Sequence, residues 1–176
     1  MMDMRVFDVL KLETIEPDHL RPTHREFAQS YQTKGSRVKL WRDVDLSHKI
    51  AAGGYNSTPS DLVMLGAAWL NDDFIPASVR EEFWTPVVLA NGQVNEQNYA
   101  LGFRRASWPI EGFGDVTHFN HGGVSKGAQC WFMIVPEHGM TIAISTNRRT
   151  DQFFDFADVY VDVLDAFLAV GESQSE

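Results

Sequence analysis

The residues best suited to chemistry lie together at His121, Gly122 and Gly123. An imidazole can exchange a proton or hold an anionic group near neutral pH. Glycines within a strand mark a bulge or the close approach of a ligand or another backbone. The flanking sequence is typical of a β-strand, so we predict a strand edge at 121–123 that is open enough for a ligand. A glycine-rich turn between two strands is the alternative interpretation of the same tripeptide.

A candidate nucleophile comes from one Ser-x-x-Lys spacing, Ser36-Arg37-Val38-Lys39. A reactive serine needs a positioned base and an apolar pocket. Ser36 instead follows a predicted Lys34-Gly35 turn and precedes residues that are typical of a strand. We therefore predict that Ser36 is not catalytic, because isolated short motifs often arise by accident.

The histidines could also suggest a metal site. His118 and His121 are three residues apart, so in a strand they point to opposite faces, and joint ligation needs a bulge. Adding Glu137 and His138 from a predicted turn would complete such a site, but no other feature supports it. We predict no metal and no cofactor. The remaining histidines are predicted to be solvated in polar loops: His19, His24 and His48.

Length and composition restrict the protein class. The 176 residues fit one domain over 1–176, with a polar, flexible tail at 171–176. A formal net charge of −9 argues against binding nucleic acid or an anionic membrane surface. No apolar run is long enough for a membrane-spanning helix. Cys130 is the only cysteine, so no intramolecular disulfide forms, and the compartment stays open.

The hydrophobic periodicity predicts an α+β fold with an antiparallel sheet packed with helices. Thr58-Pro59-Ser60-Asp61 is a helix start with a hydroxyl cap and a proline in the first turn. The terminal helix is expected at 153–170, with Phe156, Val159, Val163, Phe167 and Val170 on its apolar face. Further helices are expected at 2–10 and 77–84, and extended segments or strands at 27–32, 37–41, 99–103, 115–120, 128–135 and 140–146.

Several segments in sequence order resemble the C-terminal half of the serine β-lactamase and penicillin-binding-protein superfamily, in particular the class C β-lactamase-like esterases and D-aminopeptidases. Gly53-Gly54 with the capped helix after Thr58 is the most specific match outside the active site. Tyr99-Ala100-Leu101-Gly102-Phe103 is similar to the family's Tyr-Gly-Leu-Gly strand, and the segment from Val135 to Asn147 resembles its final hairpin. The resemblance covers roughly residues 4 to 170 and implies a partial β-lactamase/transpeptidase-like fold.

The resemblance also implies site roles. His121-Gly122-Gly123 matches the third motif of the family, which is Lys-Thr-Gly in many β-lactamases and His-x-Gly in several esterases and peptidases. By position, the backbone N–H of Val124 would be one donor of an oxyanion hole. Gly122, Gly123 and Ser125 would border the substrate, and Lys126 lies nearby. The family's nucleophilic Ser-x-x-Lys and its Tyr-x-Asn motif precede the matched region, and the chain contains no Tyr-x-Asn.

Two hypotheses follow. In the first, the chain is the C-terminal part of a serine hydrolase that acts on an ester, amide or β-lactam and lacks the segment that carries the nucleophile. In the second, it is a noncatalytic β-lactamase-like remnant that binds a ligand or a partner chain. The first implies a small-molecule acyl substrate once the site is completed. Both leave apolar surface uncovered, so we expect a homo-oligomer or a partner chain.

Overall fold

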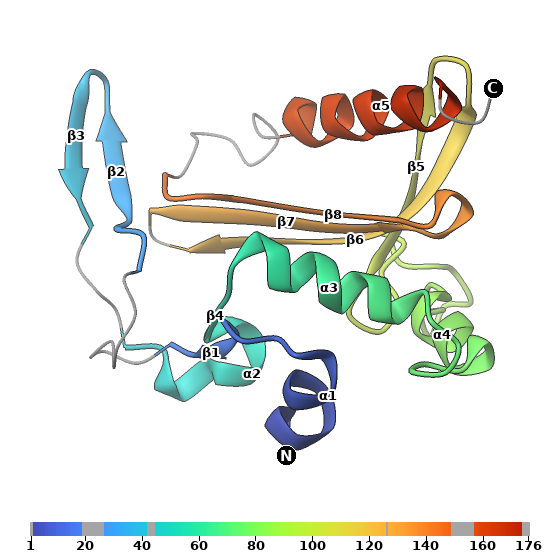
Figure 1. Cartoon of the computed structure of the whole chain (residues 1–176), viewed down its shortest axis with the longest axis horizontal. Coiled ribbons are helices and arrows are strands. Elements are labelled where there is room, and N and C mark those ends of the chain that lie inside the picture. Colours follow the sequence, from blue (N-terminus) through green and yellow to red (C-terminus); the bar gives the residue numbers. More distant parts are fainter. Residues whose placement is uncertain (1, 19–26, 42–44, 126, 149–156, 174–176) are drawn as a thin grey trace.

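A four-stranded antiparallel sheet in the order β5-β6-β7-β8 forms the centre of the protein (Figure 1). Its strands are β5 (Arg104–Ile110), β6 (Gly114–Ser125), β7 (Ala128–Val135) and β8 (Met140–Thr146). The computed structural model describes residues 2–18, 27–41, 45–125, 127–148 and 157–173. Strands connected in sequence lie next to each other, and the short 3₁₀ turn η3 (Pro136–His138) joins β7 to β8. Gly139 closes that turn at φ +60°, a backbone conformation that favours glycine.

One face of the sheet is covered by the terminal helix α5 (Ala157–Ser173) (Figure 1). Tyr160, which is 1% exposed, stacks on Trp131 at a ring-centroid distance of 4.3 Å and on Trp108 at 5.1 Å. Leu164 and Leu168 continue the same buried stripe at helical spacing. The helix is therefore held by aromatic and aliphatic burial against β5 and β7.

The opposite face is covered by α3 (Pro59–Trp69) and α4 (Ala77–Trp84), which supply a second, aromatic core. Trp84 stacks on Phe119 of β6 at 4.1 Å between ring centroids, and Trp69 packs edge-on against Phe103 at 5.0 Å. Gly66 lets α3 approach β8 closely, since a Cβ there would lie 2.8 Å from the Thr141 side chain. Strand β6 is thus packed from both sides.

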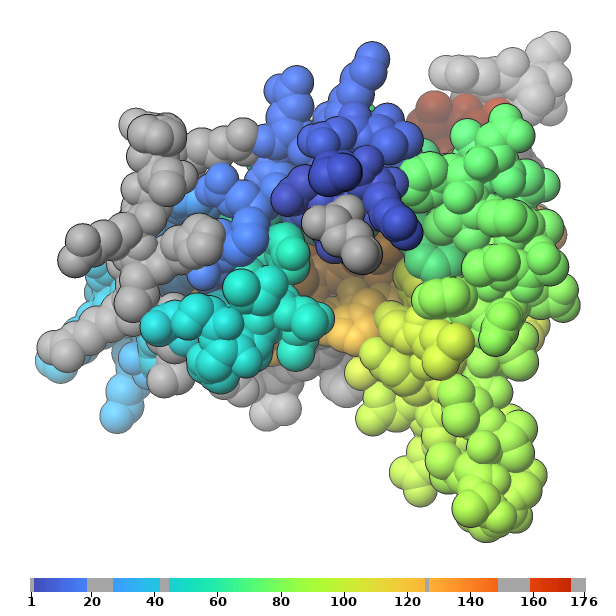
Figure 2. Space-filling view, turned by 90° about the horizontal axis from the view of Figure 1, so that it is seen from below, coloured from blue at the N-terminus to red at the C-terminus, as the bar shows by residue number. Residues whose placement is uncertain are grey.

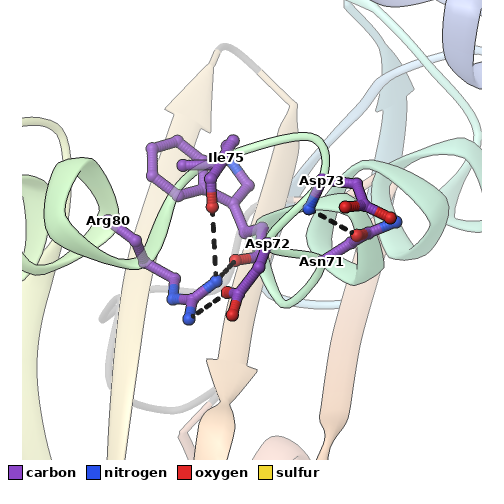
Figure 3. Close-up of polar contacts among 6 residues, drawn as sticks. Asn71, Asp72, Asp73, Ile75 and Arg80 are labelled. Atoms are coloured by element: carbon purple, nitrogen blue, oxygen red, sulfur yellow. Dashed lines mark hydrogen bonds and ion pairs between the residues drawn. The ribbon is translucent and has the colours of Figure 1, made fainter.

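Arg80 of α4 fixes the connection between α3 and α4 (Figure 3). Its guanidinium donates to the carbonyl of Trp69 at 3.0 Å and to that of Ile75 at 3.5 Å. It also forms an ion pair of 2.7 Å with Asp72, whose side chain is 69% exposed. The two hydrogen bonds from Arg80 to backbone carbonyls are partly buried, whereas the ion pair with Asp72 is solvated. The hydrogen bonds therefore contribute more to stability than the ion pair.

The predicted helix cap at Thr58 is confirmed and ties the N-terminal region to α3. Thr58 Oγ1 accepts from the backbone N–H of Asp61 at 3.4 Å. The buried Asp61 carboxylate accepts from Thr14 N at 2.6 Å and from Thr14 Oγ1 at 2.7 Å. The N-terminal region comprises η1 (Asp3–Phe7), α1 (Asp8–Leu10), β1 (Glu16–Pro17), η2 (Ser47–Lys49), α2 (Ile50–Gly53) and β4 (Tyr55–Asn56).

A two-stranded hairpin of β2 (Tyr31–Lys34) and β3 (Arg37–Leu40) extends away from the four-stranded sheet (Figure 1). It is attached where Tyr31 N donates to the carbonyl of Asn147 at 2.9 Å. Ser36 lies exposed in the turn of this hairpin. The extended segment expected at 37–41 is confirmed over Arg37–Leu40, whereas the one expected at 27–32 is displaced, because the strand begins at Tyr31 and continues through Lys34.

The α+β prediction is confirmed, but three details of the sequence analysis are wrong. No strand spans 99–103, because the strand begins at Arg104 and Gly102 is in a turn at φ +89°. The predicted apolar face of α5 is not the buried one, since Phe167 is 63% exposed and Val159 is 44% exposed. The helix also continues through Ser173, into the segment expected as a tail; Phe156 lies outside the described residues.

Candidate functional site

The candidate site lies where β6 runs past the end of β5. The last residue pair between these strands is Arg104 with Asn120. From His121 to Ser125, β6 pairs only with β7. Successive residues of a strand direct their backbone N–H and C=O groups alternately to its two edges. About half of the backbone groups from His121 to Ser125 therefore face the edge of β6 that β5 does not cover. The strand prediction for 121–123 is confirmed, and the alternative of a glycine-rich turn is wrong.

His121 is hydrogen-bonded to a residue from a distant part of the sequence. Its Nε2 lies 3.0 Å from the Tyr99 hydroxyl, and the two rings meet edge to face with centroids 5.8 Å apart. The residue is exposed, but its ring is partly shielded by this contact. Partial burial and the positive charge of Arg104 lower the pKa of His121, while a backbone hydrogen bond at Gly122 acts in the opposite direction. The ring is therefore mainly neutral at pH 7.

Sequence reasoning placed Tyr99 in a family motif but assigned it no role at His121. The Arg104 guanidinium also contacts Tyr99, at 5.2 Å from the centre of its ring. No spacing rule relates position 99 to position 121. The contact between Tyr99 and His121 follows from the hairpin of β5 and β6. This hairpin places Arg104 opposite Asn120, and so brings the turn before β5, which contains Tyr99, beside His121.

The four residues after His121 are either glycines or exposed, so this part of β6 is accessible. Gly123 is opposite Cys130, and a Cβ at Gly123 would lie 2.7 Å from the Cys130 sulfur. Val124 is 48% exposed, and Ser125 is also exposed. Glycine at 123 therefore keeps the strand flat against β7 while its outer side stays accessible. Lys126 lies outside the described residues.

The surface around the sheet is hollowed. Figure 2 shows strand atoms, coloured gold to orange, at the bottom of a depression between α2 and the yellow-green segment that precedes β5. That segment extends away from the body of the molecule on one side of the depression. A hollow with strand atoms at its floor is a suitable place for a ligand to lie against the sheet.

Other candidate residues do not join this site. His118 is fully buried on the opposite face of β6, against Trp108 at 4.0 Å between ring centroids, and burial lowers its pKa to about 4. His138 packs on Phe113 instead. Within the described ranges, no three His, Cys, Asp or Glu residues are grouped to hold a metal ion. His48 is exposed, as expected, while His19 and His24 lie outside those ranges.

Most of the chain matches the model of a known protein family. The Beta-lactamase family model matches residues 1–166. The chain belongs to the Beta-lactamase family. No curated protein sequence matches it. In the described part of this family member, no helix is long and apolar enough to cross a membrane.

Solved structures show the same fold. The chain is similar to a D-stereospecific amidohydrolase from Streptomyces sp., with a TM-score of 0.65 and 23% identity over 82% of this chain. It is similar to SurE with a TM-score of 0.59 and 25% identity over 84% of this chain, and to FmtA from Staphylococcus aureus with a TM-score of 0.68 and 15% identity over 93%. The chain spans 42%, 35% and 42% of these three proteins, respectively.

Proposed function

We propose that this chain forms the substrate-binding edge of a serine hydrolase that transfers the acyl group of an ester, amide or β-lactam. The observation that carries the proposal is the stretch from His121 to Ser125, which pairs with β7 and leaves its other edge uncovered. An acyl substrate can lie along such an edge and accept hydrogen bonds from the strand backbone.

Each residue of the edge has a role in this proposal. The neutral His121 ring hydrogen-bonds the substrate or moves a proton, since its lowered pKa makes a permanent cation unfavourable at pH 7. The backbone N–H of Val124 donates to the oxygen on which negative charge develops. Gly122 and Gly123 let the substrate approach the backbone, and Ser125 borders the substrate beyond them.

The attacking serine is proposed to lie outside these 176 residues. Ser36 is exposed in the turn between β2 and β3, whereas a reactive serine needs an apolar pocket. The chain also spans less than half the length of each structural neighbour named above. The remaining part of the catalytic site is therefore assigned to a further polypeptide segment that faces the depression.

Intact-mass measurement after treatment with a fluorophosphonate probe tests the proposal. The 176-residue chain and the longest open reading frame that contains it are compared. We expect no adduct on the shorter chain and one adduct on a serine of the longer protein, outside the shared residues. An adduct on the shorter chain, mapped with Ser36→Ala as a control, would show that the nucleophile assignment is wrong. Absence of an adduct on both would favour a noncatalytic ligand-binding protein.

The proposal also includes association of the shorter chain. Apolar side chains are exposed in the segment between α4 and β5 and in the N-terminal region; Val88 is 60% exposed and Met4 is 76% exposed. Surfaces of this kind are covered in complete domains or oligomers. Multi-angle light scattering should therefore show oligomers of the 176-residue chain. A monodisperse monomer would contradict this part of the proposal.

A further inference from the structure

We propose that Tyr99 is a positioning residue that holds the His121 ring in one orientation, with the ring proton on Nδ1 and Nε2 as a hydrogen-bond acceptor. The effect on catalysis rests on the proposed function. The effect on the ring itself does not, and it can be measured without a substrate.

The contact between the two rings sets the direction of the hydrogen bond. Tyr99 Oη and His121 Nε2 are 3.0 Å apart. A phenolic hydroxyl is a better donor than an alcohol, and the unprotonated nitrogen of a neutral imidazole is a good acceptor. The hydroxyl therefore donates to Nε2, which leaves the proton of the neutral ring on Nδ1. A free neutral imidazole side chain has the opposite preference, with the proton mostly on Nε2, so the contact reverses it.

Tyr99 can impose this preference because its own backbone is held on both sides. Asn95 Oδ1 accepts from Tyr99 N at 2.8 Å, and Asn95 Nδ2 donates to Tyr99 O at 2.7 Å. The backbone N–H of Val87 also donates to Tyr99 O, at 3.0 Å. A residue fixed through both of its backbone groups presents its side chain with little loss of freedom on contact.

The Tyr99 ring also contacts a cation. The Arg104 guanidinium lies 5.2 Å from the ring centre, and its Nε donates to Gln97 Oε1 at 2.9 Å. The phenol thus contacts both a cation and the imidazole. The same positive charge disfavours protonation of His121 and lowers its pKa, which keeps Nε2 available as an acceptor.

Nitrogen-15 NMR of the imidazole in the 176-residue chain tests the proposal directly. In the unmodified chain above the pKa of His121, we expect Nδ1 to carry the proton in most molecules. In Tyr99→Phe, the ratio should reverse toward Nε2–H by about fivefold or more. Asn95→Ala should shift the ratio in the same direction by a smaller factor. A predominantly Nε2–H ring in the unmodified chain would overturn the proposal, even if neither variant folds.

Matched variants separate positioning from a general loss of structure. Tyr55→Phe removes a hydroxyl from an exposed tyrosine in β4, and Asn91→Ala removes an amide from the same loop as Asn95. Both should leave the tautomer ratio of His121 unchanged. If Tyr99→Phe keeps the unmodified ratio while its unfolding midpoint is also unchanged, Tyr99 does not position the ring.

Hydrolysis by the longest reading frame adds a second readout. There Tyr99→Phe should lower kcat about tenfold and change KM less than twofold, because the ring is misoriented in the transition state rather than lost for binding. An unchanged kcat together with a reversed tautomer ratio would overturn the positioning role in catalysis. If the protein shows no hydrolysis at all, the proposed function fails, while the NMR result still decides the state of the ring.

Discussion

A single methyl group at position 123 tests how tightly β6 packs on β7. In Gly123→Ala the new Cβ would lie 2.7 Å from the Cys130 sulfur, whereas unstrained contacts are about 3.5–4.0 Å. The sulfur must therefore move by roughly 1 Å, and overpacking of this kind costs about 1–3 kcal/mol. Alanine also restricts the unfolded chain, which stabilises the folded state by about 0.4–1 kcal/mol. We expect a net destabilisation of about 1 kcal/mol.

The Cys130→Ala background isolates the contact. Without the sulfur, Gly123→Ala has no close neighbour and should be neutral or stabilising by up to about 0.5 kcal/mol. The double-mutant cycle should therefore give a coupling free energy of about 1.5 kcal/mol. Urea unfolding of the four proteins measures it, and the single Gly123→Ala change should lower Tm by about 2–4 °C. Equal effects of Gly123→Ala in both backgrounds would show that the cost does not come from the contact with the sulfur.

Three further predictions concern charge and hydrogen bonding. Arg104→Met should raise the pKa of His121, because a neighbouring positive charge that disfavours the imidazolium is removed; an NMR titration that shows no rise would contradict the assigned cause. Burial lowers the pKa of His118 from 6.5 in the unfolded chain to about 4 in the folded protein. The unfolded chain therefore takes up the proton first as the pH drops from about 6.5 to 4, and the free energy of unfolding should fall by about 3 kcal/mol over this range. In His118→Phe this loss should disappear from chemical denaturation curves. Asp61→Ala should cost about 2–4 kcal/mol in urea unfolding, since it leaves the N–H of Thr14 without its acceptor, and a loss below about 1 kcal/mol would show that water replaces the carboxylate.

Local signals predicted much of the fold because the physics behind them is local. Thr58 and Pro59 define the start of α3 through a cap hydrogen bond and a preset backbone angle. The two strands at 128–135 and 140–146 have the predicted bounds, because their apolar runs are separated by a proline-to-glycine turn. The segment 99–103 has similar composition but forms no strand, since the Asn95 side chain takes up the backbone groups of Tyr99.

The buried face of α5 could not be predicted from hydrophobic periodicity. The stripe with Val159, Val163 and Phe167 and the stripe with Tyr160 and Leu164 are one residue apart, and both are apolar. Periodicity cannot choose between them, because each has helical spacing. The choice depends on Trp108 and Trp131, which stack on Tyr160 from two strands of the sheet.

From the sequence alone came the α+β fold class, the resemblance of His121-Gly122-Gly123 to a β-lactamase-like third motif, and the prediction of a strand there, with a glycine-rich turn left as the alternative. These conclusions depend on residue types and short spacings, which act over a few neighbouring residues. Only the tertiary structure decided that β5 ends opposite Asn120 and leaves the next residues of β6 with a free edge. It also brought Tyr99 to His121, because a contact between residues 22 positions apart depends on the register of a sheet.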